Sequence, residues 1–207
     1  MLDGSQQDVA VTWDVTDADY EAMRTGGVAE YTYTGTADGM EATITVQMIE
    51  FNFLDDYSFE DSENKEQSAA WTVINYGAED TEIYVEAKAS DSKTGTNHYH
   101  FWNESADAIN FDLQQEVTLE AGSYKFSICT MGGDCGESYT AYIYVIINGE
   151  TVCTEECLFT AYDEWHTAEI PSFTVADGDS VTVGIHVEIP AAGAWGKIDD
   201  ALLNSLS

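Results

Sequence analysis

Most of the chain alternates hydrophobic and polar residues with a period of two, which is typical of β-strands that bury one face. Asn148-Gly149 predicts a two-residue hairpin, because both positions tolerate positive φ. Asp38-Gly39, Ala121-Gly122 and Asp177-Gly178 predict further turns. The alternating segments are rich in Val, Ile, Thr, Tyr and Phe: VAVTW, EYTYTG, ATITVQM, EIYVEAK, HYHFW, INFDLQQEVTL, YKFSICTM, AYIYVII, TVCTE, SFTVA and SVTVGIHVEI. The pattern therefore predicts an all-β protein.

The strand pattern divides the chain at about residue 50. Residues 1–50 hold a few strands, too few to bury an independent core. They also hold one short predicted helix, from Asp17 to Arg24, with Thr16 or Asp17 as its N-cap and Gly26-Gly27 at its end. Residues 51–207 carry roughly eight to ten strand candidates at intervals typical of a β-sandwich or jelly roll.

Charge and composition narrow the possible partners. The 207 residues include 6 basic and 39 acidic side chains, for a net charge of −33, and Arg24 is the only arginine. Nucleic-acid binding is excluded, because it needs clustered Lys and Arg, and anionic membranes and polyanionic substrates are disfavoured. No apolar run approaches the ~20 residues of a membrane span. With 44% hydrophobic residues, the chain is expected to fold with an acidic surface.

The four cysteines give little sign of a disulfide scaffold or a zinc site. They are sparse for this length, no C-x-x-C occurs, and no histidine stands at zinc-finger spacing from a cysteine pair. Buried or free thiols are favoured over a bridge.

The strand Asn97–Trp102 is the most informative for function. A period of two places His98, His100 and Trp102 on one face, with Tyr99 and Phe101 on the core face. An indole flanked by hydrogen-bonding groups suits a neutral sugar, whose apolar face stacks on the ring while its hydroxyls take directed hydrogen bonds. The alternative is a second small core on the far sheet or under a loop.

Three other stretches carry candidate binding residues. In AGAWGKIDD, Ile198 and Leu202 are expected to point inward, so Trp195, Lys197 and Asp199 share the other face. In MGGDCG, glycines allow close approach and Asp134 offers an acceptor. In YDEWH, Trp165 is a candidate outer contact. Trp13 and Trp71 are interpreted as packing residues.

Catalysis is disfavoured by what the chain lacks. No Gly-x-Ser-x-Gly, His-Glu-x-x-His or Walker loop occurs. No strand carries glutamates at i and i+4 in the arrangement of a glycosidase pair. The larger unit also has no arginine with which to neutralise a uronate.

The order of motifs after residue 51 resembles a known family. DDYSFED, Trp71, ASDSKTG, YHFW, DLQQEVTLEAGSYKFS, MGGDCG, YIYVIINGE and GAWGKIDDALL follow one another as in the carbohydrate-binding modules of family 61, which are appended to bacterial arabinogalactan endo-β-1,4-galactanases. The resemblance spans about residues 52 to 206. Residues 8–48 resemble the later part of a bacterial Ig-like domain whose first strand is missing.

The resemblance implies a fold, a ligand and a metal. The fold is a galactose-binding-like jelly roll after a partial Ig-like β-unit (residues 1–50). The metal is a structural calcium held by Glu60, main-chain carbonyls around Lys93, and Asp199, since calcium takes six to eight oxygen ligands. Two positions depart from the family: Asp56-Tyr57 stands where Asn-Pro is usual, and Cys135 replaces a small residue.

The expected function is non-catalytic binding of a neutral polysaccharide, with β-1,4-galactan implied by the resemblance alone. The module would hold a catalytic domain in the parent chain, or a surface protein, on plant galactan outside the cell. Three alternatives stay open: a starch-binding module, an adhesin or scaffold domain with protein partners, and a jelly-roll hydrolase.

Overall fold

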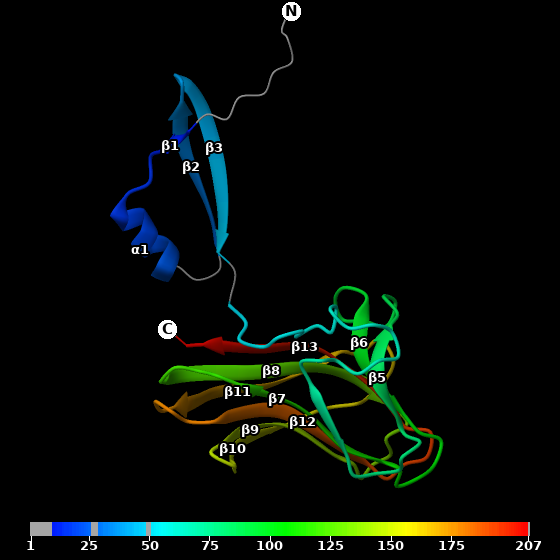
Figure 1. The fold of residues 1–207 in the computed structure, drawn as a ribbon. Helices are drawn as coiled ribbons and strands as arrows, with labels where there is room; N and C mark the ends of the chain where they lie inside the picture. The colour runs from blue at the N-terminus through cyan, green and yellow to red at the C-terminus, as the bar shows by residue number, and fades with distance from the viewer. Residues whose placement is uncertain (1–9, 26–28, 49–50, 207) are drawn as a thin grey trace, which may run out of the picture. The chain divides into compact units, whose positions relative to one another are not determined.

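The computed structural model describes residues 10–25, 29–48 and 51–206. The chain divides into two compact units, Met1–Phe51 and Asn52–Leu206 (Figure 1). None of the described helices is long and apolar enough to cross a membrane.

The first unit is a small antiparallel sheet with one helix. Strand β1 (Thr12–Trp13) pairs with β2 (Ala29–Ala37), and β2 pairs with β3 (Met40–Met48). Helix α1 (Asp17–Thr25) begins where predicted: Asp19 N–H donates to Thr16 Oγ1, and Thr16 N–H donates to Asp19 Oδ2 at 2.8 Å. This is a reciprocal cap of the capping-box type. The Gly26-Gly27 helix end lies outside the described residues, and the Ig-like assignment stays a prediction.

The second unit is a sandwich of two antiparallel five-stranded sheets, which confirms the predicted class. We call the sheet with order β10-β9-β12-β7-β4 sheet I and the sheet with order β11-β8-β13-β6-β5 sheet II. The strands are β4 (Thr72–Asn75), β5 (Glu82–Ala87), β6 (Asn97–Trp102), β7 (Ile109–Val117), β8 (Gly122–Gly133), β9 (Thr140–Ile147), β10 (Glu150–Glu156), β11 (His166–Val175), β12 (Val181–Ile189) and β13 (Trp195–Ser205).

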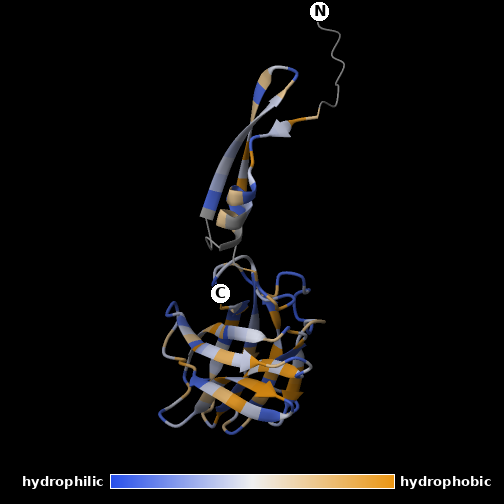
Figure 2. Cartoon of the chain, turned by 90° about the vertical axis from the view of Figure 1, so that its left-hand side faces the viewer, coloured by the Kyte–Doolittle hydropathy of each residue, from blue (hydrophilic) through white to orange (hydrophobic). Residues whose placement is uncertain are grey.

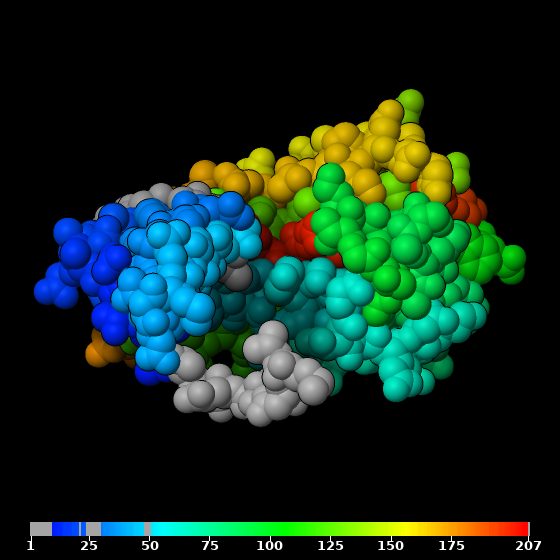
Figure 3. Space-filling view, turned by 90° about the horizontal axis from the view of Figure 1, so that it is seen from above, coloured from blue at the N-terminus to red at the C-terminus, as the bar shows by residue number. Residues whose placement is uncertain are grey.

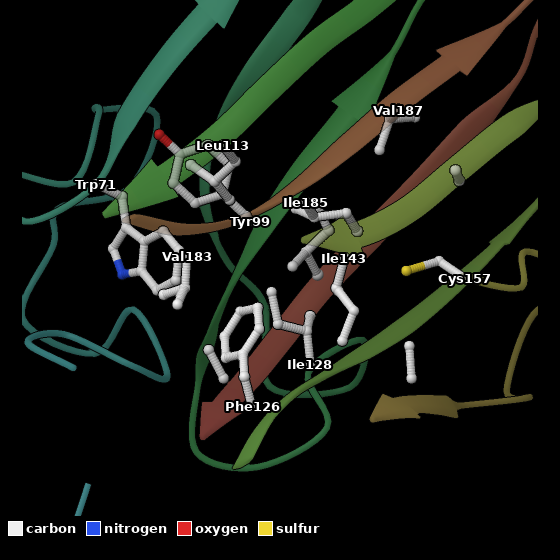
Figure 4. Close-up of a cluster of buried hydrophobic side chains, with 14 of the residues drawn as sticks. Trp71, Tyr99, Leu113, Phe126, Ile128, Ile143, Cys157, Val183, Ile185 and Val187 are labelled. Atoms are coloured by element: carbon white, nitrogen blue, oxygen red, sulfur yellow. The ribbon is translucent and has the colours of Figure 1, made fainter. Parts of the chain in front are cut away.

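The core lies between the two sheets and is built from alternate residues of nearly every strand. Tyr99, Leu113, Phe126 and Ile185 are buried and converge from β6, β7, β8 and β12 (Figure 4). Trp71 packs there too, as predicted, with its ring centroid 5.7 Å from that of Phe59. Hydrophobic residues are accordingly concentrated in the strands, and hydrophilic residues in the connecting loops (Figure 2).

The segment before β4 pairs with sheet II at two places: residues 53 and 57 bond to β13, and residues 65 and 66 bond to the edge strand β5. Lys65 N–H donates to the Val85 carbonyl at 2.7 Å, and Val85 N–H donates to the Glu66 carbonyl at 2.9 Å. The teal surface of this segment therefore lies against the green surface of β5 and β6 (Figure 3). These main-chain bonds cover the outer edge of β5.

The turns predicted at Asp38-Gly39, Asn148-Gly149 and Asp177-Gly178 are present, whereas Gly122, predicted as part of a turn, begins strand β8. Asn148 and Gly149 both have positive φ, at 53° and 82°, as the two-residue hairpin requires. The strand β4 was not predicted. In β13 the register shifts between Asp199 and Leu202, where Asp200 has a φ of 46°. This bulge reverses the alternation, so the prediction that Leu202 points inward is wrong: Ala201 and Leu203 are the buried residues.

The four cysteines, Cys129, Cys135, Cys153 and Cys157, are free, and all except Cys153 are buried. The free thiols match the expectation from the sequence. Burial raises the pKa of the Cys135 and Cys157 thiols to about 12, so neither is a reactive thiolate at neutral pH.

Candidate functional site

Two tryptophans meet on the outer face of sheet II. The antiparallel register of β6 and β13 places Trp195 directly opposite Trp102. Since Tyr99 and Phe101 fill the core side of β6, the Trp102 indole stands on the outer side, where 36% of the residue is exposed. Trp195 is half-buried. The sequence predicted both residues as binding residues, and the structure brings them together.

The Trp195 indole has a defined position beside β8. Gly133 is its register partner there, and a Cβ on Gly133 would lie 3.0 to 3.2 Å from the indole ring. Trp195 Nε1 donates to Asp134 Oδ2 at 3.1 Å. Gly133 therefore lets the indole pack closely against β8, and Asp134 accepts its hydrogen bond, while ligand binding by Asp134 stays a prediction.

Tyr162, which belongs to the candidate YDEWH loop but was not chosen as its contact residue, also borders the tryptophans. Its ring centroid lies 6.3 Å from that of Trp195, and 53% of the residue is exposed. Its hydroxyl donates to Asp91 Oδ1 at 3.2 Å. The sequence pointed to this loop through Trp165, which is half-buried just before β11. Two aromatic residues in one loop could have raised Tyr162 as an equal candidate. We call Trp102, Asp134, Tyr162 and Trp195 the tryptophan face.

A buried ionic network lies next to the tryptophan face. Lys197, which is 4% exposed, has its Nζ 2.8 Å from Glu86 Oε2 and 3.3 Å from Asp91 Oδ2. The same ammonium lies 2.8 Å from His98 Nε2. His98 Nε2 also lies 3.0 Å from Glu86 Oε2, and Nδ1 lies 3.0 Å from Ser92 Oγ, so both ring nitrogens of His98 contact the network.

The network sets the ionisation of its members. Burial and the neighbouring Lys197 charge lower the pKa of His98 to about 4, so its imidazole is neutral at pH 7. Burial, followed by Lys197, also lowers the pKa of His100. For Glu86, burial opposes ionisation, but the hydrogen bond and charge of Lys197 outweigh it, and the pKa lies below its ordinary value.

The expectation that His98 and Lys197 look outward is wrong. Both lie on the predicted face of the sheet, but the loop between β5 and β6 folds over that face and brings Ser92 and Asp91 onto them, so His98 has no exposed surface. His100 is intermediate: its side chain is 14% exposed, and its Nδ1 makes no hydrogen bond within the part of the chain that the structure describes. The two alternatives for this strand thus apply to different residues: His98 is covered by a loop, and Trp102 is open.

Glu86, His98 and His100 form the one group of potential metal ligands found among the described residues, with ligand atoms within 4.8 Å of one another. The Lys197 ammonium already lies among these atoms, at 2.8 Å from both Glu86 and His98. A divalent ion would have to displace a buried positive charge. The group is therefore better described as a lysine-centred ion cluster.

The three residues expected at a calcium site meet at the turn between β5 and β6. Asp199 Oδ2 accepts the main-chain N–H of Lys93 at 2.8 Å, and Glu60 Oε1 accepts those of Thr96 and Asn97, both at 2.7 Å. The contacts of the turn to these carboxylates thus come from N–H groups, whereas the expectation was for carbonyls.

Asp199 nevertheless has the chemistry of a cation ligand. It is completely buried, and within the described ranges it forms no ion pair with a basic side chain. Burial and the neighbouring charge of Asp200 raise its pKa to about 7. A calcium ion would neutralise the negative charges of Asp199 and Asp200, and carboxylate oxygens are the donors that calcium prefers.

No family model and no curated protein matches the sequence. Among solved structures, the chain is similar to TmCBM61 in complex with β-1,4-galactotriose, with 28% identity, a TM-score of 0.60, and coverage of 75% of this chain and 99% of that chain. This similarity confirms the resemblance of residues 52–206 to carbohydrate-binding modules of family 61.

More distant structures share the fold alone. The CBM22-1-GH10 modules of Clostridium thermocellum xylanase 10B, complexed with xylohexaose, have 15% identity and a TM-score of 0.52 over 77% of this chain and 29% of that chain. A cyclase from Fischerella sp. TAU has 9% identity and a TM-score of 0.56 over 74% of this chain and 98% of that chain. The sandwich therefore occurs in both binding modules and enzymes, and function must be argued from the site.

Proposed function

We propose that residues 52–206 form a non-catalytic module that binds a neutral plant polysaccharide, specifically β-1,4-galactan, on the tryptophan face. The observation that carries this proposal is the direct cross-strand pairing of Trp102 with Trp195 on an open sheet face. The galactotriose bound by the similar family 61 module supports galactan as the ligand.

The face combines the two interactions that a neutral sugar needs. The indoles of Trp102 and Trp195 offer apolar surfaces on which the C–H faces of sugar rings stack, each contributing about 1 kcal/mol. Asp134 and the exposed ring of Tyr162 border the indoles, and a carboxylate accepts hydrogen bonds from sugar hydroxyls. The net charge of −33 favours a neutral ligand over an acidic one.

The buried ionic network supports the face without contacting the ligand. Lys197 on β13 joins Glu86 on β5 and His98 on β6 through contacts of 2.8 Å. The three strands that carry or flank Trp102 and Trp195 are therefore tied together under a loop. A rigid platform loses less conformational entropy when a ligand binds.

Calcium is proposed as a structural ion at the turn between β5 and β6. Glu60 and Asp199 would supply carboxylate oxygens, and the main chain around Lys93 would complete the site. Bound calcium would neutralise the buried Asp199 and hold the loop that covers His98.

In the parent protein the module would work by targeting. Two stacked rings and a few hydrogen bonds correspond to affinities of about micromolar to millimolar. Such weak binding is sufficient, because a tethered module raises the local concentration of its attached domain at an insoluble substrate. We therefore propose that the protein works outside the cell, secreted or attached to the cell surface, with a catalytic domain or surface protein as its covalent partner.

Affinity electrophoresis in gels that contain galactan, starch or xylan tests the proposal. We expect retardation in the galactan gel alone and no release of reducing sugar from any of the three polymers. Retardation by starch alone would assign the module to α-glucans. Migration unchanged in all three gels would overturn carbohydrate binding in favour of protein partners, and released reducing sugar would make the unit a hydrolase.

A further inference from the structure

The outer face of sheet I, on the opposite side of the sandwich from the tryptophan face, carries a cavity of about 290 Å³. Its lining includes Tyr76, Asp112, Tyr142, Tyr144 and His186. None of these residues contributes to the tryptophan face. Three tyrosines and a histidine around one cavity are unusual on a sheet face that only has to meet water.

The register aligns three of these residues in one row. His186 on β12 is opposite Asp112 on β7 and opposite Tyr142 on β9. The rings of Tyr142 and His186 are 5.1 Å apart, with their planes at 35°. The two rings therefore form a continuous aromatic wall.

Asp112 is held in one orientation by its neighbours. The Tyr76 hydroxyl donates to Asp112 Oδ2 at 2.8 Å, and His186 Nδ1 donates to Oδ1 at 2.8 Å. Each carboxylate oxygen keeps a second lone pair. The second ring nitrogen of His186, Nε2, makes no hydrogen bond to any residue that the structure describes.

The next row of the sheet is shaped around Tyr144. Gly184 leaves the space in which the phenol ring lies, because a Cβ there would come within 2.7 Å of the Tyr144 hydroxyl oxygen. That hydroxyl passes over β12 and donates to Gln114 Oε1 on β7 at 2.9 Å. Tyr144 is thus a fixed part of the cavity lining, with 4% of the residue exposed.

We propose that this cavity is a second carbohydrate site, which binds one neutral hexose ring. The Tyr142 and His186 rings would take the apolar face of the sugar, and Asp112 and His186 Nε2 would hydrogen-bond its hydroxyls. A volume of about 290 Å³ is at the lower limit of ligand pockets and suits a single ring rather than a chain. The exposed Glu188 and the strong negative net charge disfavour an anionic ligand.

The site shares its ligand class with the proposed function but does not depend on the tryptophan face. Two sites on opposite sheets would let one module contact two polysaccharide chains. Binding to an insoluble polymer would then be stronger than binding to a short oligosaccharide.

NMR signals of aromatic side chains distinguish the two sites. D-galactose and β-1,4-galactotriose are titrated into the full chain and into Trp102→Ala, Tyr142→Ala and Asp112→Asn variants. We expect saturable shifts of the His186 ring signals in the millimolar range, retained in Trp102→Ala. Tyr142→Ala should weaken them about tenfold. Tyr20→Ala, which removes a 61% exposed tyrosine of the first unit, is the control.

Each outcome decides between the two sites. Unmoved His186 signals at saturating galactotriose, or equal shifts in wild type and both Tyr142→Ala and Asp112→Asn, would overturn the second site. Loss of the His186 shifts in Trp102→Ala would also overturn it, because those shifts would then come from the tryptophan face. Shifts at His186 with none at Trp102 or Trp195 would instead keep this site and refute the proposed function. Asp112→Asn preserves side-chain shape, so the test holds even if Tyr142→Ala folds poorly.

Discussion

Trp102 and Trp195 face each other across adjacent antiparallel strands, although they lie 93 positions apart in the sequence. Their pairing brings the HFW and AWG stretches into a single binding face.

Replacing either tryptophan should weaken binding without unfolding the module. We expect Trp102→Ala and Trp195→Ala each to lower the affinity for galactotriose about tenfold, which corresponds to about 1.4 kcal/mol. Isothermal titration calorimetry gives the affinity. Tyr57→Ala, at another exposed aromatic residue, is the control and should bind as wild type does. Unchanged affinity in both tryptophan variants would remove the indoles from the site.

Asp134 should act by positioning the Trp195 indole. Asp134→Asn keeps an acceptor oxygen for Trp195 Nε1 and tolerates the φ of 58° at this position. Asp134→Ala loses both advantages. Galactotriose titrations should therefore show near-normal affinity for Asp134→Asn and several-fold weaker affinity for Asp134→Ala. Equal affinities for the two variants would contradict the role of this hydrogen bond.

Lys197 should matter for stability far more than Lys88, although both ammonium groups contact Asp91. Lys197→Met leaves Glu86 and Asp91 without their buried cation and should cost about 3 kcal/mol. Lys88 has a 54% exposed side chain, so Lys88→Met should cost less than about 1 kcal/mol. Urea unfolding measures the free energy of unfolding of both variants. Decreases of similar size would show that Lys197 is not the main cation of the buried network.

Acidification should destabilise the second unit through His98. Its pKa is about 4 in the fold, below the ordinary value of 6.5, so the unfolded chain binds the proton more readily. Neutral His98 therefore contributes its full stabilisation above pH 6.5. As the pH falls toward 4, the free energy of unfolding decreases by about 1 to 3 kcal/mol. Lowered pKa values of His100 and Glu86 act in the same direction.

The contribution of His98 is isolated by comparing wild type with His98→Gln in urea unfolding at several pH values. The free energy of unfolding of the variant should fall less steeply between pH 6.5 and 4. Parallel curves would show that His98 does not titrate in this range.

Calcium should stabilise the second unit. At a concentration one hundred times its dissociation constant, a bound ion adds about 2.7 kcal/mol. Thermal unfolding with calcium and with chelator measures the shift, which Glu60→Gln should reduce and Lys93→Ala should leave intact, because the predicted ligand at Lys93 is main chain. A wild-type melting temperature that is indifferent to chelator would refute the site.

The calcium shift should also depend on pH. Without the ion, the pKa of Asp199 is raised from 3.8 to about 7 in the fold, so the folded state holds this proton more tightly than the unfolded chain does. The resulting stabilisation is complete below pH 3.8 and is lost as the pH rises through 7. Calcium needs the ionised carboxylate, so the shift in melting temperature should be larger at pH 8 than at pH 5.

The fold was largely predictable, because a period of two marks most strands and Asn148-Gly149 marks a hairpin. The site was predictable only in part. Alternation placed His98 on the correct face of β6, but it could not show that the loop after β5 covers that face. The cavity beside His186 depends on the register of β12 with β7 and β9, which brings Asp112 and Tyr142 together across two strand pairs.

The bulge at Asp200 shifts the phase of β13 by one residue, so the strand has two halves that serve different purposes. Trp195 and Lys197 precede it, and Ala201 and Leu203, which close the core, follow it. Without the bulge, an unbroken alternation would place Trp195 and Leu203 on the same face of the strand. Either the Trp195 indole would then point into the core or Leu203 would point into solvent. The strand could not supply both a tryptophan to the binding face and a leucine to the core.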